Sequence, residues 1–376
     1  MRIDHFTHSR NSRHAAHRKH GRQVRLVCAL ACHLIGILTG TSGAVSGRLE
    51  LRMADEAPST GAIDGSSLLP NIAVDRTDIG SRSSGGITAV QIAAGQLHTL
   101  VLATDGTVWA WGDNDYGQLG NGGIYSRPIA PVQVTGLSGV VAVAAGGHHS
   151  LALRSDGSVW AWGSNDKRQL GQAERQFYLE PIQMQTLSGV VAIAAGYQHS
   201  MAVKSDGTVV AWGENLSCQL GIGSRSAPTS APLTVIGLSN VILVSGGSSH
   251  SLALKNDGTV WSWGTNFQGK LGDGTQTDRC APVQVSGLVG VAAVASGGGH
   301  STALLNDGTV WVWGDNAYNQ LGDGTEVDSL TPKQVSGLSE VSAISAGAYF
   351  TLAAKSDGSV WGWGMNSSGQ LAQADL

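Results

Sequence analysis

The feature that most constrains this chain is the stretch DGTVWAWG at 105–112, which returns with nearly the same letters five more times. The returns begin at Asp156, Asp206, Asp257, Asp307 and Asp357. The residue at the second tryptophan position follows the previous one by 50 or 51 residues throughout. A fixed period of this size is typical of solenoids, propellers and arrays, in which each repeat buries its apolar face by stacking on its neighbours. The sequence therefore predicts six similar stacked units.

Each copy is expected to form the second half of a β-hairpin. Asp-Gly is favoured in two-residue primed turns, where both central residues need positive φ. Side chains alternate along the strand that follows, so Trp109 and Trp111 share one face and Val108 lies on the other. All eleven tryptophans occupy these two positions, and Val210 is the one exception among the six copies. Because a buried aromatic side chain covers roughly 150–250 Å², we expect the tryptophans to lie where neighbouring units stack.

The rest of each unit supplies three more strands. An apolar strand such as 140–145 ends in glycine, two variable residues follow, and then His-Ser or His-Thr begins the strand before the Asp-Gly turn. After the tryptophan strand come Asn-x-x-x-Gln-Leu-Gly, a variable loop and a Pro-x-x-Val strand. Four short strands per fifty residues are typical of a propeller blade. We predict an all-β fold, a β-propeller with six recognisable four-stranded blades over residues 88–376.

The three motifs together resemble the repeats of the regulator of chromosome condensation family. They are Ala-Gly-x-x-His-Ser-Leu-Ala-Leu, Asp-Gly-x-Val-Trp-x-Trp-Gly and Asn-x-x-x-Gln-Leu-Gly, in this order over residues 88–376. The resemblance implies a propeller that usually has seven blades, so the ring has six or seven. A seventh blade would be lost, truncated or built from residues 45–87. Beta-lactamase inhibitory protein II, an exported bacterial member that blocks an enzyme with loop aromatics, is similar in architecture.

Residues 1–44 are predicted to be a signal peptide. Seven basic residues within 1–25 precede an apolar run at 26–38, and small residues at 42–44 suit cleavage. The apolar run is about a dozen residues, shorter than the ~20 that a membrane-spanning helix needs. A misassigned start codon or an uncleaved anchor is the competing interpretation. We therefore expect a secreted, periplasmic or cell-surface protein, with a cytoplasmic one as the alternative.

Residues 45–87 are expected to be a Gly/Ser-rich linker. Within it, the segment 69–74 resembles the Pro-x-x-Val strand of the repeats. The sixth unit stops at Gln370 and Leu371 without that strand. The linker could therefore supply the missing strand and close the ring.

The net charge limits the kinds of partner that the chain can bind. Residues 45–376 hold 16 Lys and Arg against 26 Asp and Glu, a net charge of −10. Binding to nucleic acid depends on clustered basic residues that release counterions from phosphates, so no direct nucleic-acid partner is expected.

Cys218 and Cys280 lie in loops of consecutive units. They could pair in an oxidising compartment, but two single cysteines are more often unpaired, so we expect no disulfide.

No constellation in the sequence points to an active site, a metal or a cofactor. The recurring aspartates lie in turns one whole blade apart, too far to act as a carboxylate pair. The recurring histidines are expected to bind adjacent backbone at strand starts rather than metal; they are His98, His149, His199, His250 and His300, with Phe350 in the sixth unit. Nucleophile-elbow, phosphate-loop and zinc-protease motifs are absent from residues 45–376. We therefore predict a protein that is not an enzyme and has no cofactor.

Recognition is expected where the repeats differ, because the invariant residues build the scaffold. The first variable set lies between the strand-end glycine and the histidine and includes Gln96, Leu97, His148, Tyr197, Gln198, Ser248 and Tyr349. The second set follows the tryptophan strand and includes Tyr116, Lys167, Phe267 and Tyr318. Equivalent turns of a propeller lie around one face of the disc. These residues are the predicted partner-binding site.

The function predicted from these features is an exported, monomeric module that binds a protein partner through one face of the disc. The family resemblance implies an alternative, a guanine-nucleotide exchange factor for a small GTPase. Repeat steps of 50 or 51 residues leave no room for the long inserted wedge that nucleotide displacement calls for. A third possibility is a surface-structural repeat protein without a specific ligand.

Overall fold

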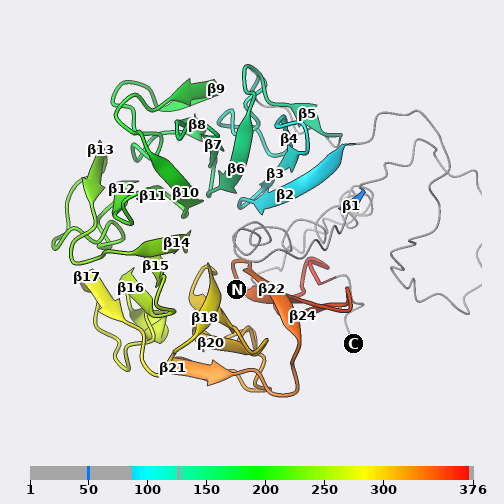
Figure 1. The fold of residues 1–376 in the computed structure, drawn as a ribbon, viewed down its shortest axis with the longest axis vertical. Coiled ribbons are helices and arrows are strands. Elements are labelled where there is room, and N and C mark those ends of the chain that lie inside the picture. The colour runs from blue at the N-terminus through cyan, green and yellow to red at the C-terminus, as the bar shows by residue number, and fades with distance from the viewer. Residues whose placement is uncertain (1–48, 51–86, 125–127, 129, 372–376) are drawn as a thin grey trace, which may run out of the picture.

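The computed structural model describes residues 49–50, 87–124, 128 and 130–371. In this part of the chain six antiparallel sheets follow one another around a central axis, and the strands nearest that axis (Figure 1) are β2 (Thr88–Ala94), β6 (Val140–Ala145), β10 (Val190–Ala195), β14 (Val241–Gly246), β18 (Val291–Ser296) and β22 (Val341–Ala346). The all-β propeller predicted from the repeats is confirmed, and of the six or seven blades expected the described residues form six. The predicted signal peptide and the segment 69–74 lie outside the described residues.

The blades use their strands in chain order. Blade 1 holds β2 (Thr88–Ala94), β3 (His98–Ala103), β4 (Val108–Gly112) and β5 (Val132–Gln133). Blade 2 holds β6 (Val140–Ala145), β7 (His149–Arg154), β8 (Val159–Ser164) and β9 (Phe177–Gln183). Blade 3 holds β10 (Val190–Ala195), β11 (His199–Lys204), β12 (Val209–Gly213) and β13 (Thr229–Thr234). Blade 4 holds β14 (Val241–Gly246), β15 (His250–Lys255), β16 (Val260–Gly264) and β17 (Arg279–Gln284), with the 3-10 turn η1 (Phe267–Gly269). Blade 5 holds β18 (Val291–Ser296), β19 (His300–Leu305), β20 (Val310–Gly314) and β21 (Ser329–Gln334). Blade 6 holds β22 (Val341–Ala346), β23 (Phe350–Lys355) and β24 (Val360–Gly364).

The predicted linker contains one short strand. β1 (Leu49–Glu50) pairs antiparallel with β2, so the first sheet has five strands. The repeat pattern gave no indication of this strand, since its two residues match no motif of the blades.

The Asp-Gly hairpin differs from the primed turn that the sequence predicts. Of its loop residues only Gly106 has positive φ, at +78°, and its N–H donates to the Ala103 carbonyl at 3.0 Å. This is the pattern of a three-residue loop that ends in a glycine bulge. The Asp105 carboxylate instead accepts from the Thr107 N–H at 2.9 Å, which holds the loop closed. The expectation of two central residues with positive φ was therefore wrong.

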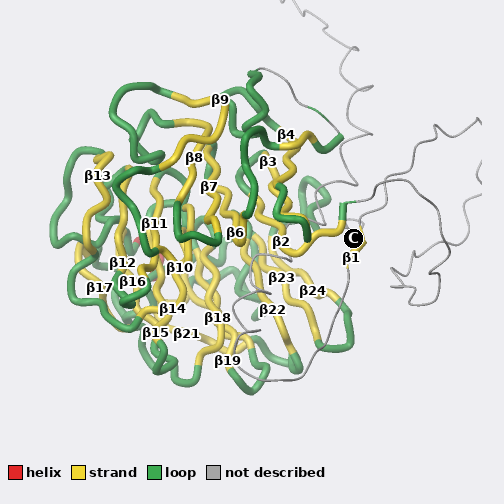
Figure 2. Tube along the Cα trace, turned by 45° about the horizontal axis from the view of Figure 1, so that its top comes forward, coloured by secondary structure: helices red, strands yellow, loops and turns green. Residues whose placement is uncertain are grey.

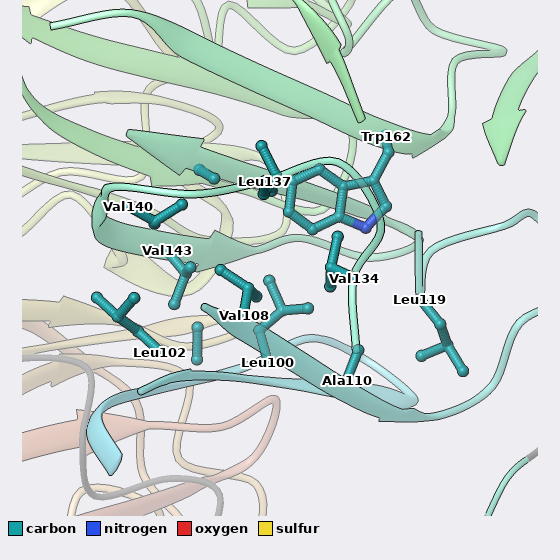
Figure 3. Packing of buried hydrophobic residues seen from close by; sticks show 12 residues of the cluster. Leu100, Leu102, Val108, Ala110, Leu119, Val134, Leu137, Val140, Val143 and Trp162 are labelled. Atoms are coloured by element: carbon teal, nitrogen blue, oxygen red, sulfur yellow. The ribbon is translucent and has the colours of Figure 1, made fainter. Parts of the chain in front are cut away.

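Each tryptophan strand packs against two different blades, as the alternation predicts. In the junction between blades 1 and 2, Val108 and Ala110 of the first blade meet Trp162 of the second, and all three are fully buried (Figure 3). The side chain of Trp160 packs against the same cluster and is partly buried. The second tryptophan of the repeat therefore lies deep in the junction and the first lies nearer its edge.

One backbone carbonyl joins blade 2 to blade 1. The Gln118 carbonyl accepts from the Trp162 indole N–H and from the Ser150 hydroxyl, both at 2.9 Å. The Ser150 Oγ lies 2.9 Å from Nε2 of His98, which belongs to blade 1. The same three bonds recur at every later junction, where the carbonyls are those of Gln169, Gln219, Lys270 and Gln320.

A glycine stands before each of these histidines for a steric reason. A Cβ placed on Gly95 would lie 2.3 Å from the His98 ring and 2.6 Å from the Gly146 carbonyl. Real Cβ atoms do not approach other atoms so closely, so only glycine fits beneath the imidazole. The repeated Ala-Gly-x-x-His motif is therefore a packing unit.

The two ends of the blade series differ from the inner blades. Val360 of blade 6 is 52% exposed, whereas the five equivalent valines are fully buried. Phe350 takes the place of the histidine in this blade, which has no following blade among the described residues to supply a hydroxyl. Trp111 of blade 1 is only partly buried and belongs to a small cluster around Ile92 and Val101. In Figure 1 blades 6 and 1 are the two ends of the series.

The first prediction separates the two tryptophan environments. Trp263 is fully buried and its indole N–H donates to the Gln219 carbonyl at 2.9 Å, whereas Trp361 is 53% exposed. Trp263→Ala should lower the free energy of unfolding by about 3–5 kcal/mol as a large-to-small core change. Trp361→Ala should change it by no more than about 1 kcal/mol. Urea unfolding checks both, and an equal loss in the two variants would contradict the assignment of Trp263 to the buried junction and of Trp361 to an exposed edge.

Candidate protein-binding face

The two variable sets of residues lie on the same end of the strands. In blade 1 the N–H of Asp113, just after the tryptophan strand, donates to the Leu97 carbonyl at 2.8 Å. The same bond joins the two loops in the other blades, at Ser164 and His148, Glu214 and Gln198, Thr265 and Ser249, Asp315 and Gly299, and Met365 and Tyr349. We call this end the loop face. The opposite end, which carries the Asp-Gly hairpins, is the turn face; Figure 2 shows loops at both ends of the strands.

Three predicted site residues from three blades form one aromatic cluster on the loop face. The ring centroids of Tyr116 and His148 are 5.1 Å apart, and those of His148 and Tyr197 are 6.1 Å apart. The two tyrosines remain 43% and 37% exposed, and the histidine between them is half-buried. These distances suit tilted and edge-on aromatic pairs, so the cluster presents ordered aromatic surface to solvent.

A second pair lies farther around the same face. Tyr318 of blade 5 and Tyr349 of blade 6 have ring centroids 5.2 Å apart, and both are more than 40% exposed. Phe267 is 68% exposed and makes no ring contact with another described aromatic residue. The structure therefore brings five of the predicted aromatic residues into two groups and leaves Phe267 apart.

Two polar residues of the predicted site make contacts between neighbouring blades. Lys167 forms an ion pair with Glu214 of the next blade at 3.2 Å. The Ser248 hydroxyl donates to the Gly298 carbonyl of the next blade. The remaining predicted residues lie in the same loops, Gln96 and Leu97 exposed and Gln198 half-buried. Sequence reasoning missed the partner Glu214, for which the repeats gave no signal because this position varies.

Cys218 and Cys280 are joined by a disulfide, with their Cα atoms 4.5 Å apart, so the expectation of free thiols was wrong. The bond covalently reinforces a contact that recurs between blades. At the equivalent junctions a Cβ on Gly117 or Gly269 would lie within 3 Å of the next blade's outer strand, at Leu179 and Leu330. Aligning the repeats places Cys218 and Cys280 at these two positions. That alignment, rather than the cysteine count, is the signal that could have found the pair.

Comparison with known proteins fixes the family. The chain matches the RCC1-like domain over residues 67–376. It belongs to this family. Among solved structures, it is similar to yeast RCC1 (Prp20) from the complex with Kap60, with a TM-score of 0.67 and 26% identity over 75% of this chain and 71% of that one. Human WBSCR16 gives a TM-score of 0.66 and 28% identity over 73% and 76% of the two chains.

Curated relatives of this RCC1-like domain are larger proteins. The human E3 ubiquitin-protein ligase HERC2 is 35% identical over 193 residues, which cover 50% of this chain and 3% of the ligase. The Arabidopsis thaliana ultraviolet-B receptor UVR8 is 34% identical over 201 residues, 52% of this chain and 46% of the receptor. The matched part is thus less than half of the receptor and a small fraction of the ligase.

The five recurring histidines of the RCC1-like domain, at 98, 149, 199, 250 and 300, are buried and neutral. The Ser150 hydroxyl donates its hydrogen to the Gln118 carbonyl, so it accepts from Nε2–H of His98. The expectation that these rings bind backbone directly was wrong, because a hydroxyl of the next blade stands between. All five Nδ1 atoms are buried without a partner. Within the described ranges no three His, Cys, Asp or Glu side chains could hold a metal ion together.

Burial sets the protonation of these rings. Removal from water lowers the pKa of His98 and His149 to about 3 and of His199 and His300 to about 4. It lowers the pKa of His250 well below its ordinary value too. The described part of the chain also has no helix of the length and hydropathy that a bilayer crossing requires.

The second prediction is a loss of stability in mild acid. Below pH ~6.5 the unfolded chain protonates its histidines while the native chain does not, so each of the five buried rings should cost about 1.4 kcal/mol per pH unit down to its folded pKa. The free energy of unfolding should fall steeply from pH 6.5 to pH 4.5. His199→Phe, which copies Phe350, should reduce that slope by about a fifth. Urea unfolding across this range checks the slope, and a stability that stays flat from pH 7 to pH 5 would contradict it.

Proposed function

We propose that this RCC1-like domain is an exported, non-enzymatic module that binds a protein partner through its loop face. The observation that carries the proposal is the cluster of Tyr116, His148 and Tyr197, which spans three blades and is partly exposed. Partly exposed aromatic side chains held in one arrangement are the usual anchors of protein interfaces.

Backbone contacts between blades hold the cluster in place. The Gly147 N–H donates to the Tyr197 carbonyl at 3.1 Å, and the Tyr197 N–H donates to the Gly247 carbonyl at 3.0 Å. Tyrosine also has few rotatable bonds, so ordering it on binding loses little entropy. A surface that is already ordered before contact binds with a smaller entropic cost.

Two observations support export. The sequence of residues 1–44 has the composition of a signal peptide. Cys218 and Cys280 form a disulfide, and such bonds persist mainly in oxidising compartments. The second observation is independent of the first, because it concerns the folded blades.

The relatives support a binding role. Yeast RCC1 (Prp20) has been solved bound to Kap60, and its binding properties to Gsp1p and histones have been described. These are partners of the yeast protein. They support a binding role for this chain because the yeast protein is an example of a propeller whose surface binds other proteins. Ligase activity is not transferred, since the matched residues are 3% of HERC2.

The second candidate is guanine-nucleotide exchange on a small GTPase. Similarity to yeast RCC1 at a TM-score of 0.67 favours it. The regular 50- or 51-residue steps and the proposed export disfavour it. Catalysed nucleotide release from a panel of small GTPases, at a rate dependent on the loop face, would replace the first proposal.

The third prediction is the test of the loop face. The full chain captures its partner from the extracytoplasmic fraction of its own organism, and surface plasmon resonance then measures the affinity. Tyr116→Ala/Tyr197→Ala should weaken binding at least about 30-fold, because truncated aromatic anchors cost 2 kcal/mol or more. Val327→Ser, a 65% exposed position in blade 5 and outside the three blades of the cluster, is the matched control and should bind normally.

Two results would contradict the proposal. The first is a partner that binds the double variant as tightly as the natural chain. The second, which concerns export alone, is natural protein found in the cytoplasm with Met1 intact.

A further inference from the structure

The turn face carries a feature that the loop-face proposal does not use. The first strand of every blade shifts register near its start, which leaves one residue unpaired at the equivalent position in each. These residues are Val90, Val141, Val191, Ile242, Ala292 and Ser342. The four large ones are 40%, 43%, 57% and 53% exposed, in chain order. A bulge turns a side chain away from the ladder, and here it turns aliphatic side chains toward solvent.

The bulged residues come from neighbouring strands around the axis. The first strands of the blades line the centre in Figure 1. Side chains link them directly, since the amide of Gln91 in β2 donates to and accepts from the backbone of Val143 in β6 at 3.1 and 2.9 Å. In β18 the Ser296 N–H donates to the Ser245 hydroxyl of β14 at 3.0 Å. The aliphatic side chains therefore form an arc around the axis rather than scattered surface positions.

Acidic side chains lie beside this arc. The Val140 N–H donates to the Gly106 carbonyl at 3.3 Å, which places the Asp105 turn of blade 1 against the start of β6 and next to Val141. The same bond recurs at the four following junctions, Gly157 with Val190, Gly207 with Val241, Gly258 with Val291 and Gly308 with Val341. A hydrogen bond from the Thr or Ser two residues on lowers the pKa of each turn aspartate, so these carboxylates are ionised at neutral pH.

The charge of the turn face is acidic on balance. Its hairpins, inter-strand loops and adjoining strand ends hold seven acidic residues, the six turn aspartates and Glu340, against four basic ones, Arg154, Lys204, Lys255 and Lys355. Ion pairs within this set join Lys255 to Asp257 at 3.5 Å and Lys355 to Glu340 at 3.8 Å, which leaves five acidic residues against two basic ones. In four blades a basic residue stands two positions before the turn aspartate. Ala103 and Leu305 take that position before Asp105 and Asp307.

A hollow of about 340 Å³ opens on this face between blades 4 and 5. Ile242 and Ala292, both bulge residues, line it together with Asn256, Asn306 and the ion pair of Lys255 and Asp257. Val289, which is 74% exposed, adjoins its edge at Gly290. The hollow thus offers an apolar wall beside an ion pair and two asparagines, with room for one aliphatic side chain, and the carboxylates for the flanking cations come from the turn aspartates around it.

We propose that the turn face is a second docking surface, which binds a segment of a partner protein carrying an aliphatic side chain flanked by lysine or arginine. The aliphatic arc and the hollow would receive the apolar side chain, and the turn aspartates would pair with the flanking cations. Opposite charges across an interface favour encounter and fix its register. The proposal rests on the described residues of the turn face alone and is independent of the loop face.

The test selects binders with the loop face disabled. A displayed library of random 12-residue peptides is panned against the full chain bearing Tyr116→Ser/Tyr197→Ser, and fluorescence anisotropy measures the affinity of the enriched peptides. We expect Leu, Ile or Val next to Lys or Arg in these peptides. Val191→Ser/Ile242→Ser, which copies Ser342, should weaken their binding at least tenfold, and Asp206→Asn/Asp257→Asn should weaken it less at high salt than at low salt. Val327→Ser, a 65% exposed position outside the turn face, should have no effect.

Three outcomes would overturn the proposal. They are the absence of enriched peptides, enriched peptides that lack basic residues, and enriched peptides that bind the Val191→Ser/Ile242→Ser variant as well as the parent. Failure here leaves the loop-face proposal intact, because partner capture by the natural chain depends on different residues.

Discussion

One backbone carbonyl per blade determines how the next blade is placed. The carbonyls at 118, 169, 219, 270 and 320 each accept an indole N–H and a hydroxyl from the following blade, at 2.8–3.0 Å. Because the acceptor is main chain, the side chain at this position can vary, and Lys270 serves where the other blades have glutamine. Two other recurring residues of the repeat hold the donors of this carbonyl in place. The histidine binds the hydroxyl, and the glycine three residues before it leaves space for the imidazole ring.

This junction explains the division of the molecule into scaffold and surface. The tryptophan, the serine and the histidine are buried at each inner junction, so their identity is fixed by packing and hydrogen bonding. The loops above them are attached through backbone bonds, as at Asp113 and Leu97, and their side chains are free to differ. Aromatic residues can therefore collect on the loop face, and aliphatic ones can occupy the bulges of the turn face, without disturbing the stack.

Much of this architecture could be predicted from the sequence. Few folds are compatible with a repeat of 50 or 51 residues in which the side chains alternate between the two faces of each strand. The face of the tryptophan strand and the shared end of the variable loops followed from the same periodicity. Other details depend on contacts between repeats. The Cys218–Cys280 pair, the hydroxyl partner of His98 and the neighbour of Lys167 each lie one blade away. The hairpin was mispredicted for a local reason, because Asp-Gly also suits a three-residue loop in which only the glycine has positive φ.

The most direct measurement of the junction is native-state hydrogen exchange at the tryptophan indoles, followed by NMR on the labelled full chain. Trp162, Trp212, Trp263 and Trp313 donate to the junction carbonyl and are fully buried, so their indole N–H groups should exchange only through large-scale unfolding. Trp111, which has no preceding blade among the described residues, should exchange orders of magnitude faster. Similar exchange rates for Trp111 and the four buried indoles would contradict the claim that the carbonyl junction holds the blades together.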